Sequence, residues 1–174
     1  ILKKALSERF LDDWNVIFDE VMSARVSVDS SKKLIRVQPH SKFRKIDIQR
    51  LVVHEIDVHA LRSYNGTKQP LLCFSTGLPN YQATEEGLAM VAERHTKTHI
   101  PRTLHTQKHV VFGILQAQEM GFVEVFEALQ EREFCSASLA YGICQRIKRG
   151  LQKPEEPGVY AKDSIYLTGW YKVD

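Results

Sequence analysis

Two kinds of hydrophobic spacing follow one another in the first part of the chain. Apolar residues recur at helical spacing over residues 3–21, which predicts a first helix. Apolar and polar residues then alternate in residues 24–28 and 34–37, on either side of the polar segment 29–33. This second pattern predicts a β-hairpin, and Pro39 is expected to close it.

A longer helical pattern fills residues 44–64. Asn65-Gly66 is expected to end this helix, because both residue types favour the backbone conformation that follows a helix. Residues 67–83 contain Gly77 and two prolines, so this segment is predicted to be a loop.

The remainder of the chain is predicted to be helical. Thr84 is a typical N-cap, and the acidic pair Glu85 and Glu86 after it would complement the positive end of a helix that runs to about Glu93. Four more helices are expected, at residues 101–120, 123–132, 136–151 and 161–170. The patterns together predict an α+β fold that is predominantly helical and has one small β-hairpin.

Composition excludes some classes of protein. The chain has 174 residues, 43% hydrophobic and 26% charged, which is ordinary for a globular domain. We expect residues 1–174 to form a single domain, and Ile1 in place of an initiator methionine indicates the C-terminal part of a longer protein. A net charge of +3 is too small to predict a nucleic-acid partner. The sequence contains no apolar run of about eighteen residues, so no membrane-spanning helix is predicted. Three scattered cysteines favour a cytoplasmic location over a disulfide framework.

Residues 54–59 read HEIDVH, close to a zinc-hydrolase motif in which histidines four residues apart bind the metal and the glutamate between them is the base. Here the histidines are five residues apart, and in a regular helix their rings would diverge by about 140°. One extra residue absorbed between Glu55 and Val58 by π-type i→i+5 hydrogen bonding would return both rings to one face. Either Asp57 or Val58 would then bulge outward, and Asp57, being polar, is the easier one to expose. The alternative is a chance pair of histidines.

A metal site here also needs a third ligand. The histidines lie in an apolar stretch, where a metal would satisfy their polar atoms. Catalytic zinc sites usually have three protein ligands and an open fourth position. Glu86 is the best candidate for the third ligand because it opens a new helix; the alternative is that Glu85 and Glu86 only complement the helix dipole.

Two other pairs of histidines are spaced four residues apart, His95 with His99 and His105 with His109. Neither pair has a glutamate directly after its first histidine. The first pair straddles a predicted helix end, and the second lies on a polar face. Both pairs are therefore disfavoured as metal sites.

Residues 54–66 (HEIDVHALRSYNG) and 84–89 (TEEGLA) resemble the bacterial QEGLA-motif family, whose eukaryotic relatives are the microtubule-associated tyrosine carboxypeptidases. Thr84-Glu85 stands where many bacterial members have Thr-Gln. The resemblance extends over most of the chain, through residues 77–81, 122–126, 146–149 and 157–169. It implies a zinc-metallopeptidase-like catalytic domain whose HExxxH helix packs on the hairpin.

The resemblance also implies one Zn²⁺ ion, held by His54, His59 and Glu86, with Glu55 as the general base. The eukaryotic members remove a C-terminal tyrosine from an acidic tubulin tail. The expected partner is therefore the C-terminus of a peptide or protein, acidic if it follows these members, and not a nucleic acid or a membrane.

Five further residues are candidates for substrate contacts. Tyr166 and Lys162 lie in the family-like tail and could donate to the oxyanion. Arg62, Arg146 and Arg149 could bind the terminal carboxylate of the substrate. The alternative for each is a solvated charge or a packed phenol, and Arg62 could instead clamp the loop that follows it.

These features predict a zinc-dependent metallopeptidase, and within that class a carboxypeptidase. The alternative is a non-catalytic regulatory or binding module with a structural or degenerate metal site, which would suit the bacterial family's name for modulating flavohaemoglobin expression. Glu55 favours the enzyme, because a structural site has closed coordination and needs no base.

Overall fold

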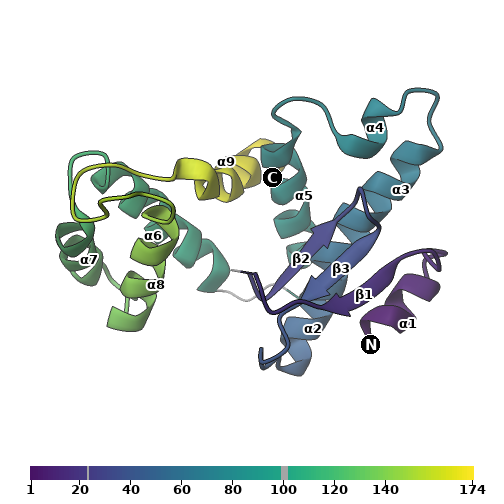
Figure 1. The fold of residues 1–174 in the computed structure, drawn as a ribbon, viewed down its shortest axis with the longest axis horizontal. Helices are drawn as coiled ribbons and strands as arrows, with labels where there is room; N and C mark the ends of the chain where they lie inside the picture. Colours follow the sequence, from purple (N-terminus) through teal and green to yellow (C-terminus); the bar gives the residue numbers. More distant parts are fainter. Residues whose placement is uncertain (23, 99–101) are drawn as a thin grey trace. The chain divides into compact units, whose positions relative to one another are not determined.

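The computed structural model describes residues 1–22, 24–98 and 102–174 (Figure 1). The chain folds into two compact units, Ile1–His99 with Lys172–Asp174 and Ile100–Tyr171. Most described residues are helical, and the strands form one three-stranded sheet. The predicted α+β class with a helical majority is confirmed.

The sheet of the first unit contains the predicted hairpin and one further strand. Strands β2 (Val26–Asp29) and β3 (Leu34–Val37) are antiparallel, with Asp29 opposite Leu34. Strand β1 (Asn15–Phe18) pairs parallel to β3, so the order is β1-β3-β2. The hairpin prediction is confirmed, whereas β1 was not predicted.

The prediction of a helix over residues 3–21 is wrong after its first turns. Helix α1 spans only Leu2–Ser7, and Phe10 has a left-handed backbone with a φ of 59°. Leu11 and Trp14 lie in the turn after α1, and both side chains are buried in the core. Two buried residues three positions apart have the same spacing as one face of a helix, which explains the wrong prediction. Residues 15–18 become a strand because their backbone pairs with β3, a contact that local spacing does not reveal.

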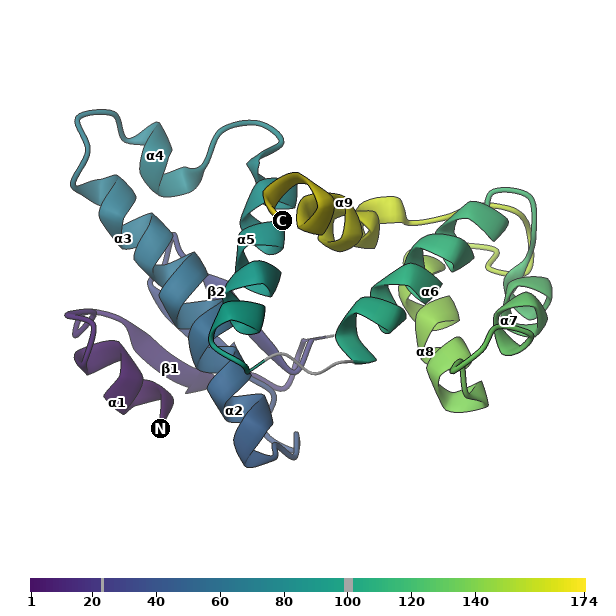
Figure 2. The same cartoon turned by 180° about the vertical axis from the view of Figure 1, so that it is seen from behind.

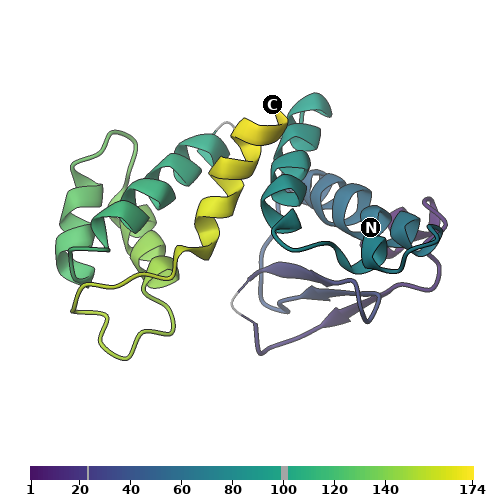
Figure 3. The ribbon, with the colours of Figure 1, turned by 90° about the horizontal axis from the view of Figure 1, so that it is seen from above.

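One long helix lies across the sheet and carries the HEIDVH motif (Figure 3). It consists of α2 (Lys45–Leu51), the π-helical segment η1 (Val52–Ala60) and α3 (Leu61–Thr67). Val26, Ile35 and Val37 of the sheet belong to the same buried cluster as Ile56 and Ala60 of the helix. The predicted packing of this helix on the hairpin is confirmed, and it holds η1 against the sheet.

Asp47 holds the first turn of α2. Its carboxylate accepts hydrogen bonds from the Arg44 backbone N–H at 2.9 Å and from the Arg44 guanidinium at 3.0 Å. These hydrogen bonds from Arg44 lower the pKa of Asp47 from 3.8 to about 2. The carboxylate is therefore stabilised in its charged form.

We expect Asp47→Asn to lower the free energy of unfolding by about 1 kcal/mol at neutral pH, because the first turn of α2 loses a charged cap. Since the folded pKa is depressed, this stabilisation is fully present above about pH 4 and is lost as the pH falls through about 2. Urea unfolding of both proteins across that range measures the difference. A difference that does not shrink with acid would contradict the role of this charge.

The long helix continues past its predicted end at Asn65-Gly66, through Thr67. Gly66 instead allows the backbone of helix α4 (Cys73–Thr76) to pack closely against the motif helix. A Cβ at this position would overlap the backbone of Phe74 and Ser75. The glycine is therefore required by packing against the following loop and not by a helix stop. The segment predicted as a loop, residues 67–83, contains this short helix, and its first residue and its last three residues belong to the helices on either side.

We expect Gly66→Ala to destabilise the first unit by about 1–3 kcal/mol, because the α4 backbone must move away. Gly142→Ala is the matched control: it lies in a helix, and nothing within 4 Å would contact its new methyl group. The control should be stabilising by about 0.5–1 kcal/mol. Thermal unfolding of the two variants should shift in opposite directions, and equal shifts would contradict the close approach.

Helix α5 (Tyr81–His95) begins three residues before the predicted N-cap Thr84. Asn80 is the N-cap and has a left-handed backbone with a φ of 65°, a conformation that asparagine tolerates. The prediction of Thr84 as N-cap is therefore wrong. Glu85 and Glu86 consequently lie inside the helix, where they face neighbouring side chains.

The second unit is a group of helices around its own core (Figure 2). Helices α6 (Arg102–Gln116), α7 (Phe122–Gln130) and α8 (Ala137–Ile147) contact one another. They are followed by the 3₁₀ helix η2 (Ala161–Ser164) and by α9 (Ile165–Val173). All four predicted helices of this region are present with shifted bounds, although Pro101 lies outside the described residues. Among the described helices, none is long and apolar enough to span a membrane.

Candidate metal centre

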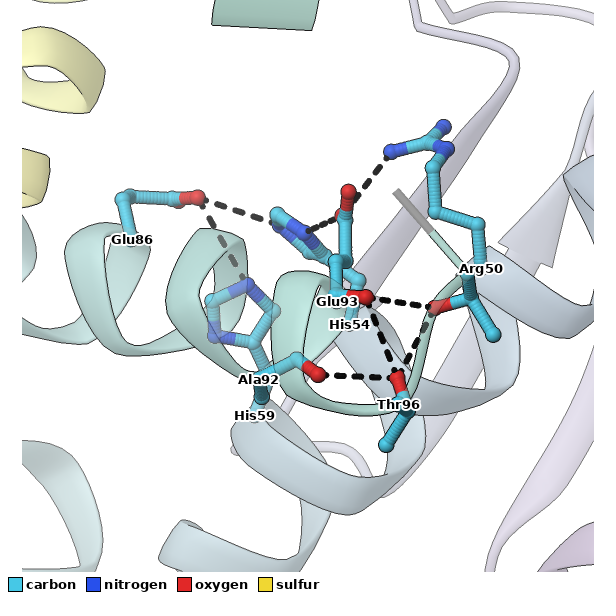
Figure 4. Close-up of polar contacts among 8 residues, drawn as sticks. Arg50, His54, His59, Glu86, Ala92, Glu93 and Thr96 are labelled. Atoms are coloured by element: carbon cyan, nitrogen blue, oxygen red, sulfur yellow. Dashed lines mark hydrogen bonds and ion pairs between the residues drawn. The ribbon is translucent and has the colours of Figure 1, made fainter. Parts of the chain in front are cut away.

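Two helices of the first unit bring three metal-ligating side chains together (Figure 4). His54 and His59 project from η1, and Glu86 projects from α5, which packs against it. Glu86 Oε2 lies 3.2 Å from His54 Nε2 and 3.8 Å from His59 Nε2. The predicted convergence of these three residues is therefore present in the structure.

The π-helical turns of η1 explain how histidines five residues apart share one face. Their ring centroids lie 5.0 Å apart, with an interplanar angle of 67°. The predicted π-type bonding is confirmed, although it extends over nine residues and not over a single turn. Asp57 is partly exposed and binds Arg9, whereas Val58 is buried. Of the two residues that could bulge outward, Asp57 is thus the more exposed one, as predicted.

The three ligand atoms fit a single metal ion. Each lies within 4.8 Å of the others. Two ligand atoms bonded to a tetrahedral zinc ion at about 2.0–2.1 Å lie roughly 3.4 Å apart, so small side-chain movements would close the site. Two imidazoles and one carboxylate form a donor set suited to a catalytic metal with an open fourth position. The geometry is compatible with one ion, and it does not identify the metal.

Glu55 lies between the two histidines in the sequence; the residue as a whole is partly exposed, whereas its carboxyl group is surrounded by protein. Burial raises the pKa of its carboxyl, against the opposing effect of His54 and His59, and the nearby charge of Glu86 raises it further. A carboxyl group with a raised pKa, next to a metal site, is suited to accept and return a proton.

Each histidine also contacts a second carboxylate on α5. His54 Nδ1 lies 2.7 Å from Glu93 Oε1, and His59 Nδ1 lies 3.3 Å from Glu85 Oε1. Burial alone would lower the pKa of His54, but hydrogen bonds to Glu86 and Glu93 raise it above its ordinary value. Burial alone would raise the pKa of Glu85, but His59 and Arg62 hold it below its ordinary value.

Glu93 is the functional candidate that the sequence analysis missed. It is 1% exposed and also binds Arg50 at 3.1 Å (Figure 4). Glu93 follows Glu86 by seven residues, which places both on one face of α5 two turns apart. That spacing, together with an arginine on the motif helix, was a signal that could have revealed it.

Arg62 clamps the loop after the motif helix, as one of its two interpretations predicted. Its guanidinium donates to Ser75 O at 2.5 Å and to Glu85 Oε1 at 2.7 Å, and it stacks over the Tyr81 ring at 5.1 Å. The Ser63 hydroxyl also donates to Ser75 O. The other interpretation of Arg62, as a substrate contact, stays a prediction.

The remaining candidates belong to the second unit. The Arg146 guanidinium binds Asp163 at 2.8 Å, and that of Arg149 binds it at 3.1 Å. Lys162 is exposed in η2, and Tyr166 lies in the first turn of α9. Their proposed contacts with substrate stay predictions.

The other histidine pairs do not form a site of three ligands among the described residues. His109 is buried in α6, and its Nε2 has no hydrogen-bond partner within the described part of the chain. The ring of His105 packs on that of Phe134. His99 lies outside the described residues, so the pair with His95 stays untested.

Comparison with known proteins finds a matching family model along the full chain and relatives along most of it. The family model described as microtubule-associated tyrosine carboxypeptidase matches residues 1–174. The chain is 28% identical over 160 residues to microtubule-associated tyrosine carboxypeptidase 1 of Homo sapiens and 27% identical over 160 residues to its Mus musculus counterpart. Each match covers 89% of this chain but 33% of the relative. The chain thus spans about a third of the length of these relatives.

Proposed function

Because the chain belongs to the microtubule-associated tyrosine carboxypeptidase family, we propose that it is a zinc-dependent carboxypeptidase. The observation that carries this proposal is the convergence of His54, His59 and Glu86, with Glu55 directly after His54 in the sequence and interacting electrostatically with all three. A structural metal site would not require a carboxyl group of raised pKa next to its ligands.

The proposed chemistry assigns a role to each of these side chains. A zinc ion held by the two histidines and Glu86 would polarise the scissile carbonyl and lower the pKa of a bound water to about 7. Glu55 accepts the proton of the attacking water and passes it to the leaving amine. Burial raises the pKa of the Glu55 carboxyl, which makes it a stronger base than an exposed glutamate.

We assign substrate contacts to the five remaining candidates. Tyr166 and Lys162 donate hydrogen bonds to the oxyanion, and Arg62, Arg146 and Arg149 attract the terminal carboxylate. Asp163 already binds Arg146 and Arg149 at 3.3 Å or less, so a substrate carboxylate would have to compete with it.

The proposed substrate is the C-terminus of a peptide or protein. Relatives are named tyrosine carboxypeptidases, which supports an aromatic C-terminal residue. An acidic tail before that residue would agree with the chain's net charge of +3. The similarity to the bacterial QEGLA-motif branch and a cytoplasmic location belong to the same proposal.

Two measurements on the purified chain test the proposed function together. Elemental analysis should find one zinc ion per chain, and mass spectrometry of an incubated peptide library should find loss of single C-terminal residues. Zinc without trimming of any peptide would instead support the non-catalytic binding module. Trimming that persists after complete removal of metal would overturn the zinc mechanism.

A further inference from the structure

We propose that Glu93 and Glu85 are positioning residues that hold both histidines with Nε2 toward the metal. The inference rests on the proposed function, because it takes a metal ion to be bound between His54, His59 and Glu86. It adds two residues whose carboxylates contact the histidines on the side away from the shared ligand Glu86.

The two nitrogens of His54 face different carboxylates. Nδ1 lies 2.7 Å from Glu93 Oε1, and Nε2 lies 3.2 Å from Glu86 Oε2. An ionised carboxylate only accepts hydrogen bonds, so Nδ1 must carry the hydrogen that is donated to Glu93. In the neutral ring this leaves the lone pair on Nε2, on the side of Glu86, where a metal would be bound.

His59 repeats the arrangement with a different partner. Its Nδ1 lies 3.3 Å from Glu85 Oε1, and its Nε2 lies 3.8 Å from Glu86 Oε2. The same reasoning places the hydrogen on Nδ1 and the free lone pair on Nε2. Helix α5 therefore supplies one ligand and two orienting carboxylates to a pair of histidines on η1.

Each orienting carboxylate is held in turn by an arginine of the motif helix. Arg50 donates to Glu93 Oε1 at 3.1 Å, and Arg62 donates to Glu85 Oε1 at 2.7 Å. Arg50 precedes His54 by four residues, and Arg62 follows His59 by three. The carboxylates are thus fixed from the same helix that carries the ligands, which restricts the rotation of both rings.

A divalent cation would balance the charges of the side chains around the site. Glu55, Glu85, Glu86 and Glu93 contribute four negative charges when ionised, and Arg50 and Arg62 contribute two positive charges. Neutral imidazoles, the form that binds a metal, would leave two negative charges over. Because Glu93 is 1% exposed, this excess would be costly without a partner, and a divalent metal ion would offset it.

The first test needs no substitution. Long-range ¹H–¹⁵N spectra of the zinc-loaded chain report which nitrogen of each histidine is coordinated. We expect Nε2 coordination and an Nδ1 hydrogen for both His54 and His59. Coordination through Nδ1 in either ring would overturn the proposal for the carboxylate that faces it.

The second test measures zinc affinity in Glu93→Gln and Glu85→Gln by competition with a chelator. Loss of an orienting carboxylate typically weakens metal binding by about 10–100-fold. We expect the larger loss for Glu93→Gln, because its contact is shorter and more deeply buried. Asp57→Asn removes the same charge from the motif helix away from the ligands, and its affinity should change by less than about twofold.

A merely structural role would give a different pattern. Glu93→Gln would then lower the stability of the metal-free chain and leave the zinc affinity and the histidine spectra of the folded protein unchanged, which would overturn the proposal. If Glu93→Gln does not fold, the spectra of the unsubstituted chain still show which nitrogen of each histidine binds zinc, and this result decides the proposal. Absence of zinc from that chain would overturn the proposed function as well, whereas Nδ1 coordination in a zinc-loaded, peptide-trimming chain would overturn this inference alone.

Discussion

Glu55→Gln is expected to lower the rate of peptide hydrolysis by about 10²–10⁴-fold while the chain keeps its metal and its fold. The amide preserves the shape of the side chain but cannot accept a proton from the attacking water. Glu55 contributes no atom to the ligand set of His54, His59 and Glu86, so metal content should not change. The rate is measured on the peptide that the library screen identifies as the best substrate.

Asp57→Asn is the matched control for this substitution. It makes the same carboxylate-to-amide change two residues further along η1, where the side chain binds Arg9 outside the ligand set. Its hydrolysis rate should stay within about threefold of the unsubstituted chain. Equal turnover by Glu55→Gln and the unsubstituted chain, with one zinc ion in each, would remove Glu55 from the mechanism.

Removal of a ligand is expected to weaken metal binding strongly and to lower the rate of hydrolysis with it. A structural zinc site with four ligands binds with about 10–16 kcal/mol, so the loss of one ligand costs about 3 kcal/mol or more. His59→Ala and Glu86→Ala should therefore bind zinc about 10²–10³-fold more weakly than the unsubstituted chain. Elemental analysis after dialysis against a weak chelator measures the loss, and hydrolysis should fall in proportion to the remaining zinc.

The exposed residues His95 and Glu20 offer controls in the same unit. His95→Ala and Glu20→Ala remove the same side chains from positions outside the ligand set and should retain one zinc ion. Full zinc occupancy in both His59→Ala and Glu86→Ala would refute the assignment of the three ligands. If only one of these variants loses its zinc, the residue substituted in the other variant is not a ligand.

The parts of the site that leave a local pattern could be predicted from the sequence. The five-residue spacing of His54 and His59 in an apolar stretch requires a π-type turn if both bind one metal, and η1 has that bonding. The β2–β3 hairpin follows in the same way from two alternating segments around a polar turn. In each case the deciding contacts lie within a few residues of one another along the chain.

The parts that depend on distant contacts could not be predicted in this way. Strand β1 exists because its backbone pairs with β3, nearly twenty residues later, and its own apolar spacing resembled a helix. The role of Glu93 depends on a partner, His54, that precedes it by 39 residues. The start of α5 at Tyr81 depends on the left-handed backbone of Asn80, whereas Thr84 has the more typical composition of an N-cap.

The π-helical turns of η1 are wider than α-helical turns, so the motif helix can contain one more residue than a regular α-helix with the same ends. In a regular helix an inserted residue rotates every later side chain by about 100°, which would separate Arg62 from Glu85 and Gly66 from α4. In this chain Leu51, before the π-helical segment, and Ala60, at its end, still belong to one buried cluster. The insertion is absorbed locally, so Leu51 of α2 and both Leu61 and Tyr64 of α3 contact the same buried cluster. A search for zinc peptidases that demands histidines four residues apart would therefore pass over helices of this kind, although their ligands meet in space.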